Sequence, residues 1–516
     1  MKRKNFVPLF VLVLVSLACN LPGLTAPVAL TPEIPAQAPD WIFTPVVLPS
    51  DGDTTPPTQP PLEATPEANQ PPSGTLKESP PYLYYTQSGD SLALVARRFE
   101  VQPFEITSPN EIATQGLLPA NQLLVIPRVL GETTPSTLLL PDSDFVYSPT
   151  TLDFDVKIYV AQAGGYLSEY REWLGSSGWT DGASIVARVA LENSINPRLL
   201  LSLLQYQSGW VLGRPGNLAQ SEYPMGFIDN NQSGLYKQLV WAVNRLHEGY
   251  YGWRAGTLLE LRFPEGKLLR IAPELNAASA ALQYFFSLQN SGDGWRKHLS
   301  LEEGLPAVHQ QMFGNPWLRA QELGGLFPAD LHQPTLILPF VRDQIWSFTG
   351  GPHGAWDPKG PRAAIDFAPG SSEPGCTVSY NSVLAAASGL VVRDGEGVLV
   401  LDLDGDGYEQ TGWVLFYLHL AARGRVKVGT QVEQGDPLGY PSCEGGASTG
   451  THVHIARKYN GEWILTDGAL PFVLGGWQVY AGGNPYEGYL QRDETKIEAS
   501  PLGTFATRII RTQEDP

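Results

Sequence analysis

The sequence predicts a multidomain protein with a small β-α-α-β module, a mainly helical middle domain and a mainly antiparallel β C-terminal domain. Residues 82–130 alternate strand and helix patterns, whereas residues 131–335 contain several apolar or amphipathic helical stretches. Residues 336–480 contain short apolar strands separated by turns rich in Gly and Asp. A length of 516 residues is ample for several such domains.

Residues 1–19 have the form of a targeting segment. A basic start at residues 2–4 precedes an apolar run from Phe6 to Leu17 that is short for a membrane-spanning helix, and the segment ends at Cys19. This arrangement resembles a bacterial lipoprotein signal, which implies that Cys19 carries a lipid and anchors the mature protein to the membrane. A simple cleaved signal and a retained anchor helix are the alternatives.

The composition of residues 20–81 predicts a linker. This segment is rich in proline, mixed with Thr, Ala, Glu and Gln. Such a composition cannot bury a core, so we expect an extended, disordered tether. The whole chain has 34 basic and 52 acidic residues, which gives a formal net charge of −18. Because no basic patch stands out, we expect no nucleic-acid partner.

The module at residues 82–130 begins with a strand, and a short helix capped by Asp90 or Ser91 follows it. We expect a second short helix over residues 103–106 and a closing strand over residues 123–127. The apolar side chains of the first helix share one face: Leu92, Val95, Ala96 and Phe99.

This module resembles a LysM module over its full length, with Gly89–Leu92, Asn110 and Val125–Pro127 at the family's positions. LysM modules bind glycans that contain N-acetylglucosamine. The resemblance implies a groove between the loop after the first strand and the loop before the last strand. A small module without glycan affinity is the alternative. The groove would place five residues near the sugar: Gly89, Asp90, Ser91, Asn110 and Ile112.

The middle domain, residues 131–335, contains a helix with a clear start. Asn196 is a good N-cap and Pro197 suits the first helical position. The following residues 198–207 are apolar on most of the helix surface, so we expect this helix to be buried. Further helices are expected over residues 235–246 and 276–288.

Residues 195–209 resemble the helix that carries the catalytic Glu of lysozyme-like transglycosylases, but Gln207 takes the place of that Glu. Gln cannot donate the proton that glycosidic cleavage requires. We therefore expect a non-catalytic binder or spacer with a lysozyme-like helical core. Glu192 or Glu222 as a substitute acid is the alternative.

The C-terminal domain contains a cluster of residues suited to a metal. His452 and His454 are two residues apart in a strand pattern, so their side chains point to the same face. His353 and His419 lie upstream, and Asp366 stands in an apolar strand. A catalytic zinc site needs three protein ligands and a water, and bound zinc activates that water and polarises a carbonyl.

His353, Asp366 and His454 supply such a ligand set. His419 and His452 are then left for proton handling and for stabilising an oxyanion. The alternative is that each histidine is an ordinary core or surface residue.

Residues 336–480 resemble the lysostaphin-type, or LytM-like, zinc endopeptidases, which cut peptide crosslinks in bacterial cell walls. By this resemblance His353, Asp366 and His454 bind one zinc ion, while His419 and His452 assist catalysis. The matching stretches are Ala364–Gly370, Val383–Val392, Tyr417–Leu420, Val432–Gly439 and Gly450–His454.

One position departs from the family pattern. Arg362 stands where the family has its first His, and a guanidinium cannot bind zinc. His353 would therefore have to reach the metal from a longer, Gly-rich loop. Asp357 lies close to His353 in the sequence and is the alternative to Asp366 as the carboxylate ligand.

A β-hairpin is predicted from residues 397–403 and 413–417, with a turn that contains Asp402, Asp404 and Asp406. We interpret these carboxylates first as turn residues and second as a Ca2+ site, because an EF-hand loop would need a Glu where Trp413 stands.

Cys376 and Cys443 are the only cysteines besides Cys19. Export makes a disulfide between them the expected state, and two free thiols are the alternative. The bond would tie the loop after the Asp366 strand to the loop before His452. Residues 481–516 are polar, and we expect a tail without chemistry.

These features together predict an extracytoplasmic, membrane-anchored zinc endopeptidase of the bacterial cell envelope that hydrolyses peptide bonds in peptidoglycan. A lipid would anchor the chain, and the LysM module would hold it on the wall. The rival interpretation is a non-catalytic wall-binding scaffold, or a regulator of another hydrolase, with a degenerate peptidase fold.

Overall fold

The computed structural model describes residues 80–370 and 375–515. The predicted signal, Cys19 and nearly all of the predicted linker lie outside the described residues. All described residues belong to one compact unit, Leu76–Pro516. Among them, no helix is both long and apolar enough to cross a membrane.

The N-terminal module consists of β1 (Tyr82–Tyr85), α1 (Leu92–Phe99), a 3₁₀ turn and β2 (Leu123–Ile126), and its two strands pair antiparallel. Ser91 caps α1, since its side chain accepts a hydrogen bond from the Leu94 amide. The expected second short helix is present only as one 3₁₀ turn, Pro103–Glu105. Thr107 pairs with Val125 directly afterwards, which draws the chain into an extended conformation.

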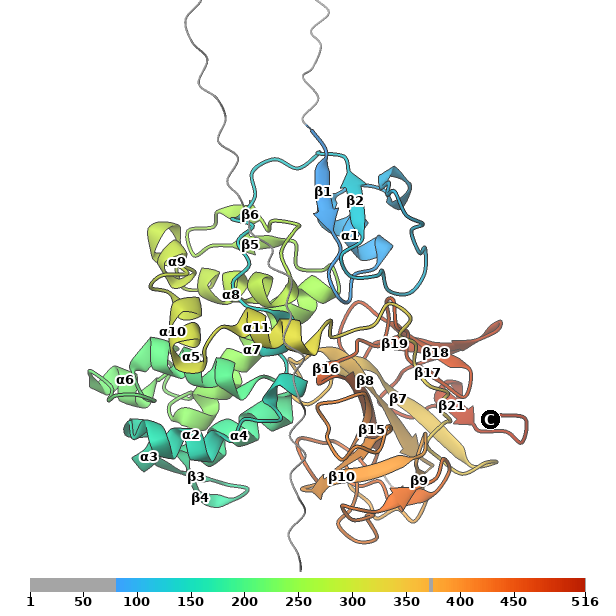
Figure 1. The fold of residues 1–516 in the computed structure, drawn as a ribbon. Helices are drawn as coiled ribbons and strands as arrows, with labels where there is room; N and C mark the ends of the chain where they lie inside the picture. Colours follow the sequence, from blue (N-terminus) through green and yellow to red (C-terminus); the bar gives the residue numbers. More distant parts are fainter. Residues whose placement is uncertain (1–79, 371–374, 516) are drawn as a thin grey trace, which may run out of the picture. The chain divides into compact units, whose positions relative to one another are not determined.

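The middle domain is mainly helical, as predicted (Figure 1). Two small hairpins accompany the helices, β3 (Arg171–Leu174) with β4 (Gly178–Asp181) and β5 (Glu260–Arg262) with β6 (Leu268–Arg270). The helices are α2 (Val156–Ala163), α3 (Tyr166–Glu169), α4 (Gly182–Asn193), α5 (Pro197–Ser208), α6 (Leu218–Glu222), α7 (Leu235–Arg254), α8 (Ala277–Ser287), α9 (Gly292–His298), α10 (Leu305–Phe313) and α11 (Pro316–Leu323).

Helices α5 and α8 follow the predicted boundaries closely, and α5 has the expected Asn196 cap. Helix α7 is longer than predicted and continues to Arg254. Gly249, in the part of α7 beyond the predicted end, is a point of close helix contact. A Cβ on Gly249 would lie 2.7 Å from the Cα of Ala281 in α8, so the missing side chain lets the two helices approach each other.

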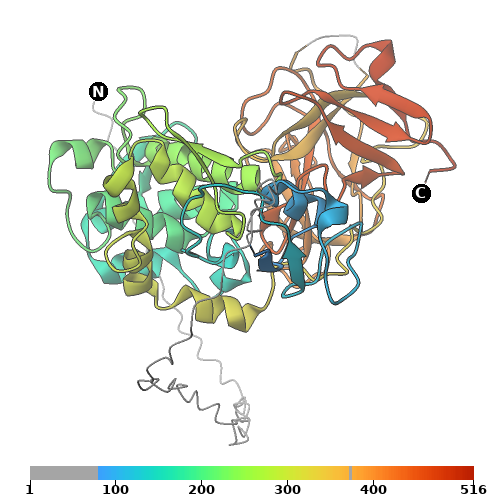
Figure 2. The same ribbon diagram turned by 90° about the horizontal axis from the view of Figure 1, so that it is seen from above.

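The C-terminal domain is built of antiparallel strands, as predicted (Figure 1, Figure 2). Its main sheet has nine strands in the order β13-β10-β11-β12-β15-β8-β7-β21, with β16 paired to β15. These strands are β7 (Ile345–Gly354), β8 (Arg362–Pro369), β10 (Gly389–Gly395), β11 (Val398–Asp402), β12 (Trp413–Leu418), β13 (Gln431–Val432), β15 (Val453–Tyr459), β16 (Glu462–Trp463) and β21 (Arg508–Ile510).

Four further strands form a second sheet in the order β17-β18-β19-β20, and β9 (Val383–Leu384) pairs with β14 (Pro437–Gly439). The strands of the second sheet are β17 (Val473–Leu474), β18 (Trp477–Ala481), β19 (Gly488–Arg492) and β20 (Thr495–Glu498).

The two faces of the main sheet belong to different apolar cores. On one face, Ile365 of β8 and Ile455 of β15 are buried in the core of the C-terminal domain. On the other face, Ala364 and Ala456 of the same strands join the apolar core of the helical domain. Because side chains alternate along a strand, Asp366 and His454 lie on the face that adjoins the helical domain.

The prediction that residues 481–516 form a separate tail is wrong. Strand β18 continues past residue 480, and β19, β20 and β21 follow it. Strand β21 pairs with β7 and thereby extends the main sheet. Leu490, Ile497 and Ile509 from this segment are buried in the core of the C-terminal domain, so residues 481–515 are part of that domain.

We expect Ile509→Ala to destabilise the C-terminal domain. Ile509 is buried and its neighbour Ile510 is 39% exposed, so Ile510→Ala is a matched control. Removing a buried isoleucine side chain costs roughly 2–5 kcal/mol, whereas the exposed site should cost less than about 1 kcal/mol. Urea denaturation followed by tryptophan fluorescence measures both. Equal effects at the two positions would contradict the packing of β21 on the core.

We also expect His247 in α7 to make the stability of the helical domain depend on pH. Burial lowers the pKa of His247 to about 3, and its Nε2 has no hydrogen-bond partner among the described residues. Below about pH 6.5 only the unfolded state takes up the proton. Stability should therefore fall as pH drops from about 6.5 towards 3, by up to about 1.4 kcal/mol per pH unit. Denaturation at several pH values measures the free energy of unfolding of the wild type and of His247→Leu, and the variant should lose this part of the pH dependence. The same pH dependence in both proteins would contradict the prediction.

Candidate metal centre

Three side chains from neighbouring strands meet at one point. His353 lies near the end of β7, Asp366 in β8 and His454 in β15. His454 stands directly opposite Asp366 in the sheet. The Nε2 of His353 lies 3.0 Å from the Nδ1 of His454, and these two nitrogens lie 3.3 and 3.2 Å from the Oδ1 of Asp366. The ligand set expected from the sequence is therefore assembled.

His353 reaches this point from a strand, which corrects the expectation of a long loop. The regular register of β7 and β8, with Phe348 opposite Phe367, would place His353 opposite Arg362 if it continued. Instead, β7 has one extra residue between Phe348 and Gly350 and another between Gly350 and His353. These bulges bring His353 opposite Ala364, two residues from Asp366 on the same face.

The metal-facing atoms carry lone pairs. The Nδ1 of His353 lies 2.8 Å from the carbonyl oxygen of Gly351, and the Nε2 of His454 lies 2.9 Å from that of Ala355. Because a carbonyl only accepts hydrogen bonds, each ring holds its proton on that outer nitrogen. The Oδ1 of Asp366 is buried without a hydrogen-bond partner. Three converging lone pairs repel one another unless a cation lies between them, so these residues fit a metal ion.

The protonation states also suit metal binding. Burial opposes ionisation of Asp366, but the neighbouring His353, His452 and His454 hold the pKa of its carboxyl well below the usual value. Burial lowers the pKa of His454 and favours its neutral form. At His353, burial is outweighed by the neighbouring Asp366, which raises the pKa, so a metal ion there would have to displace a proton more readily held. An ionised carboxylate and a neutral imidazole are the forms that bind a metal.

His419 and His452 flank this group. Their ring centroids lie 4.4 Å apart, and the Nε2 of His452 lies 3.6 Å from the Oδ1 of Asp366. The Nδ1 of each ring is directed at a backbone carbonyl, that of Glu444 for His419 and that of Gly450 for His452. Burial, together with the nearby imidazoles, lowers the pKa of His419 to about 3. In the neutral form of each ring, a proton on Nδ1 directed at the carbonyl leaves Nε2 as an acceptor.

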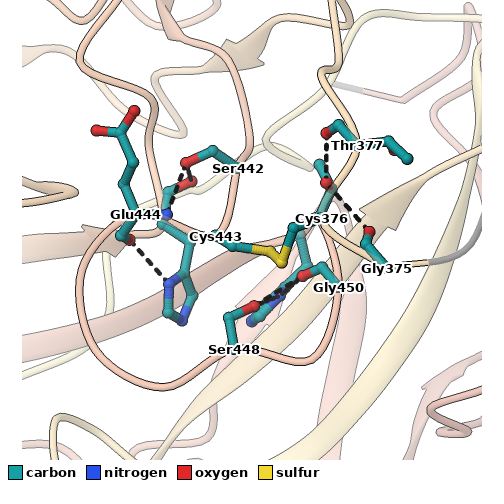
Figure 3. Close-up of a disulfide and its surroundings, with 11 residues drawn as sticks. Gly375, Cys376, Thr377, Ser442, Cys443, Glu444, Ser448 and Gly450 are labelled. Atoms are coloured by element: carbon teal, nitrogen blue, oxygen red, sulfur yellow. Dashed lines mark hydrogen bonds between the residues drawn. A yellow bond between two sulfur atoms is a disulfide. The ribbon is translucent and has the colours of Figure 1, made fainter.

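A disulfide between Cys376 and Cys443 supports the loops around these two histidines, as expected from the sequence (Figure 3). The alternative of two free thiols is wrong. Beside it, the amide of Thr451 donates to the carbonyl oxygen of Gly375 over 3.1 Å, and the amide of Ser442 donates to that of His419 over 2.6 Å. The bond thus ties the segment after β8 to the segment between His419 and His452.

Tyr486 was not among the residues predicted to form the site. Its ring stacks on His353, with ring centroids 4.1 Å apart and planes inclined by 19°. Its backbone amide donates to the carbonyl oxygen of Pro352 over 3.1 Å, and its own carbonyl accepts from Gly351 over 2.9 Å. The alternation of apolar residues around Val479 and Leu490 was the available signal that this segment folds beside the site.

Asp357 and Arg362 have structural roles. The Oδ1 of Asp357 accepts a hydrogen bond from the Lys359 amide within the turn after β7, so Asp357 does not join the metal-facing group. The alternative that it replaces Asp366 is wrong. Arg362 donates to the carbonyl oxygens of Gly482 and Gly483, 3.0 Å away in each case, and holds the segment that carries Tyr486.

Asp402, Asp404 and Asp406 also lie close together. However, the carboxylate of Asp402 accepts from the amides of Asp404, Gly405 and Gly407. Burial and the charge of Asp402 raise the pKa of Asp404 to about 6. These contacts are those of a tight turn, which was the first interpretation, and a calcium site is not supported.

The predicted glycan-binding residues do not form one surface. Gly89 and Ser91 line a large cavity, whereas Asn110 and Ile112 do not. Asp90 is buried and is bound by the Tyr84 hydroxyl at 2.6 Å and by Arg98 at 2.8 Å. The expectation that Asp90 faces a sugar is therefore wrong, because its carboxylate is used inside the module.

The helical domain offers no acid in the position expected for glycosidic cleavage. Gln207 borders a cavity of only about 10 Å³. Burial raises the pKa of Glu192, and the carboxylate is bound by Arg188 at 2.8 Å. Glu222 is exposed on α6.

Comparison with known proteins agrees with this arrangement. Residues 372–465 match the family model of peptidase family M23, and residues 138–328 match that of the LasA N-terminal domain. The family match of the middle domain thus differs from the lysozyme-like family that its α5 region resembles. The domain matches support a metallopeptidase of the LytM type.

Two curated relatives extend this result. Protease LasA of Pseudomonas aeruginosa is 28% identical over 392 residues, which cover 70% of this chain and 84% of LasA. Beta-lytic metalloendopeptidase of Achromobacter lyticus is 26% identical over 159 residues, or 30% of this chain and 40% of that protein. Both are proteases by name, and they support a metalloendopeptidase.

Solved structures that resemble this chain include the M23 metalloprotease pseudoalterin from the deep sea. It is 22% identical with a TM-score of 0.28, and the match covers 35% of this chain and 99% of pseudoalterin. The catalytic domain of lysostaphin from Staphylococcus simulans is 25% identical with a TM-score of 0.18, and covers 23% of this chain and 87% of that domain.

Gly350 generates a prediction for the centre. A Cβ on Gly350 would lie 2.3 Å from the Oδ2 of Asp366, so Gly350→Ala must displace the carboxylate. We expect metal affinity to fall about 10–100-fold, the usual effect of disturbing a ligand's support. Gly370→Ala is the matched control, because its Cβ would meet only the Ile345 carbonyl at 3.5 Å. Metal titration measures both variants, and unchanged affinity in Gly350→Ala would contradict the role given to this glycine.

Proposed function

We propose that this chain is a zinc endopeptidase of the bacterial cell envelope that hydrolyses peptide bonds in peptidoglycan. The observation that carries the proposal is the convergence of three unprotonated ligand atoms, from His353, Asp366 and His454, on one point. The relation to protease LasA supports peptide-bond hydrolysis. The resemblance of residues 336–480 to lysostaphin-type enzymes supports a wall peptide as the substrate.

In this proposal His353, Asp366 and His454 hold one zinc ion, which when bound polarises the scissile carbonyl and activates a water. Gly351 and Ala355 keep the two imidazoles in the tautomer that the metal requires. The protein thereby positions the ligands before any substrate arrives.

His452 and His419 handle protons in this proposal. Each ring has an Nε2 that can accept a proton, because its Nδ1 proton is directed at a backbone carbonyl. One Nε2 removes a proton from the attacking water and passes it to the leaving amine. The other, when its ring carries a proton taken up from solvent, donates a hydrogen bond to the carbonyl oxygen.

The proposal also includes attachment to the envelope. A lipid on Cys19 would anchor the chain to the membrane, and residues 20–81 would connect this anchor to the N-terminal module. The N-terminal module would bind wall glycan as a LysM module does. The rival proposal, a non-catalytic scaffold, differs in that it needs neither metal nor hydrolysis.

We expect the purified chain to bind one zinc per molecule and His454→Ala to lose both zinc and activity, because a three-ligand site cannot spare a ligand. Elemental analysis and release of peptide fragments from peptidoglycan measure the two properties. His332→Ala is the control, since His332 is an exposed histidine outside the centre. Full zinc occupancy in His454→Ala would contradict the assignment, and a wild-type chain without zinc or hydrolysis would favour the scaffold.

We expect His452→Ala and His419→Ala to keep their zinc but to lose about 10²–10⁴-fold in rate, the usual contribution of a general acid–base group. Comparison of zinc content with the rate on the same preparation separates the two roles. Loss of zinc from His452→Ala would show that His452 is a metal ligand, and that the roles of His452 and His454 have been exchanged.

A further inference from the structure

The guanidinium group of Arg423 lies beside two tyrosine rings in the C-terminal domain. Its central carbon is 4.8 Å from the ring centre of Tyr380 and 5.8 Å from that of Tyr440. The faces of aromatic rings attract a cation at such distances, so Arg423 has a preferred position although it is exposed. Gly424 supports this arrangement, because its φ is +80° and a Cβ on it would lie 2.8 Å from the ring of Tyr440.

Arg423 has no counter-charge in the described part of the chain. Its side chain forms neither a hydrogen bond nor an ion pair there, whereas the basic residues that follow it are paired. Arg425 lies 3.9 Å from the carboxylates of both Asp394 and Glu444, and Lys427 lies 2.9 Å from that of Asp394. Since the chain has 52 acidic and 34 basic residues, a shortage of carboxylates does not explain the unpaired guanidinium group.

Arg423 and Tyr440 stand on two segments that meet at His419. Arg423 follows His419 by four residues, so their Cα atoms are at most about 14 Å apart. The amide of Ala421 donates to the carbonyl oxygen of Tyr440 over 2.8 Å, and the amide of Ser442 donates to that of His419. The pair of Arg423 and Tyr440 therefore lies on the side of the metal centre where the proton-handling histidines are found.

Tyr380 comes to the same place from the segment that begins at the disulfide (Figure 3). The hydroxyl of Thr451, the residue before His452, donates to the carbonyl oxygen of Thr377 over 2.6 Å. Tyr380 follows Thr377 by three residues and is 68% exposed. Both tyrosine rings are thus attached to backbone that also holds a histidine of the centre, and at least one ring face is open to a ligand.

The chemistry of these three side chains selects a carboxylate on a peptide. The planar fork of an arginine binds both oxygens of a carboxylate, and the tyrosine rings offer apolar contact to the atoms beside it. An extended peptide spans about 3.3–3.6 Å per residue. A peptide whose scissile bond lies at the metal centre would therefore bring a carboxylate to Arg423 from within about four residues of that bond.

We propose that Arg423, Tyr380 and Tyr440 bind a free carboxylate of the peptide substrate and make the protein select acidic peptides. The inference rests on the proposed function in that a wall peptide is the source of the carboxylate. It adds a specificity-determining residue, Arg423, that takes no part in holding the metal or in moving protons.

The test is isothermal titration calorimetry of the full chain with a soluble stem peptide of peptidoglycan, at low salt, where exposed charges are least screened. One form of the peptide has free carboxylates, and the other has every carboxylate converted to a primary amide. The wild type should bind the free form about fivefold more tightly, the upper range for an exposed ion pair. Arg423→Gln should bind both forms equally. Tyr380→Leu should reduce the preference about twofold, because the cation loses one of its rings.

Arg508→Gln is the matched control and should keep the wild-type preference. Arg508 is also exposed and also lies over an aromatic ring, 4.7 Å from the ring centre of Phe505. It stands opposite Ser347, far along β7 from His353, so its charge is remote from the proposed carboxylate site.

Three results would overturn the proposal: no binding or no preference in the wild type, an unchanged preference in Arg423→Gln, or tighter Arg423-dependent binding of poly(glycerol phosphate) than of the peptide. His454→Ala should keep the preference for the free form although it should lose hydrolysis. A wild-type chain that shows the Arg423-dependent preference but does not hydrolyse peptidoglycan would overturn the proposed function and keep the carboxylate site. The two proposals can therefore fail separately.

Discussion

The guanidinium group of Arg254 connects the three described domains. It lies 2.9 Å from the carboxylate of Glu462 in the C-terminal domain, 3.0 Å from Asp142 in the helical domain and 2.9 Å from the carbonyl oxygen of Ser88 in the module. The Arg254 and Glu462 side chains are almost completely buried. Removing one member of such a buried pair costs roughly 3–5 kcal/mol, because the other charge stays without compensation. The domains are therefore held in one arrangement.

The helical domain also supports the candidate metal centre. Ala355, whose carbonyl oxygen orients His454, is buried in the same apolar core as the helices, and Trp356 packs against that core. The face of the sheet that carries Asp366 and His454 is thus completed by residues from a domain that contributes no ligand. This arrangement explains why the ligands are nearly inaccessible to solvent while His452 remains partly exposed.

Features that depend on residues close together in the sequence were predictable, both at the metal centre and in the helical domain. The alternation around His452 and His454 defines a strand face, and Asn196 with Pro197 defines the start of α5. The path of His353 was not predictable, since bulges in β7 depend on the pairing with β8. The contribution of Tyr486 was missed for the same reason, because it follows from contacts between segments that are far apart in the sequence.

The bulges in β7 also affect how related proteins can be found. The two extra residues in β7 change its partners on β8 and still bring His353 to the metal-facing side, so the number of residues between two ligands does not by itself define such a site. Arg362 then becomes available for another task, and here it holds the segment before β19. Genome searches that demand a fixed spacing between His and Asp will overlook such chains, whereas searches that align strand partners will recover them.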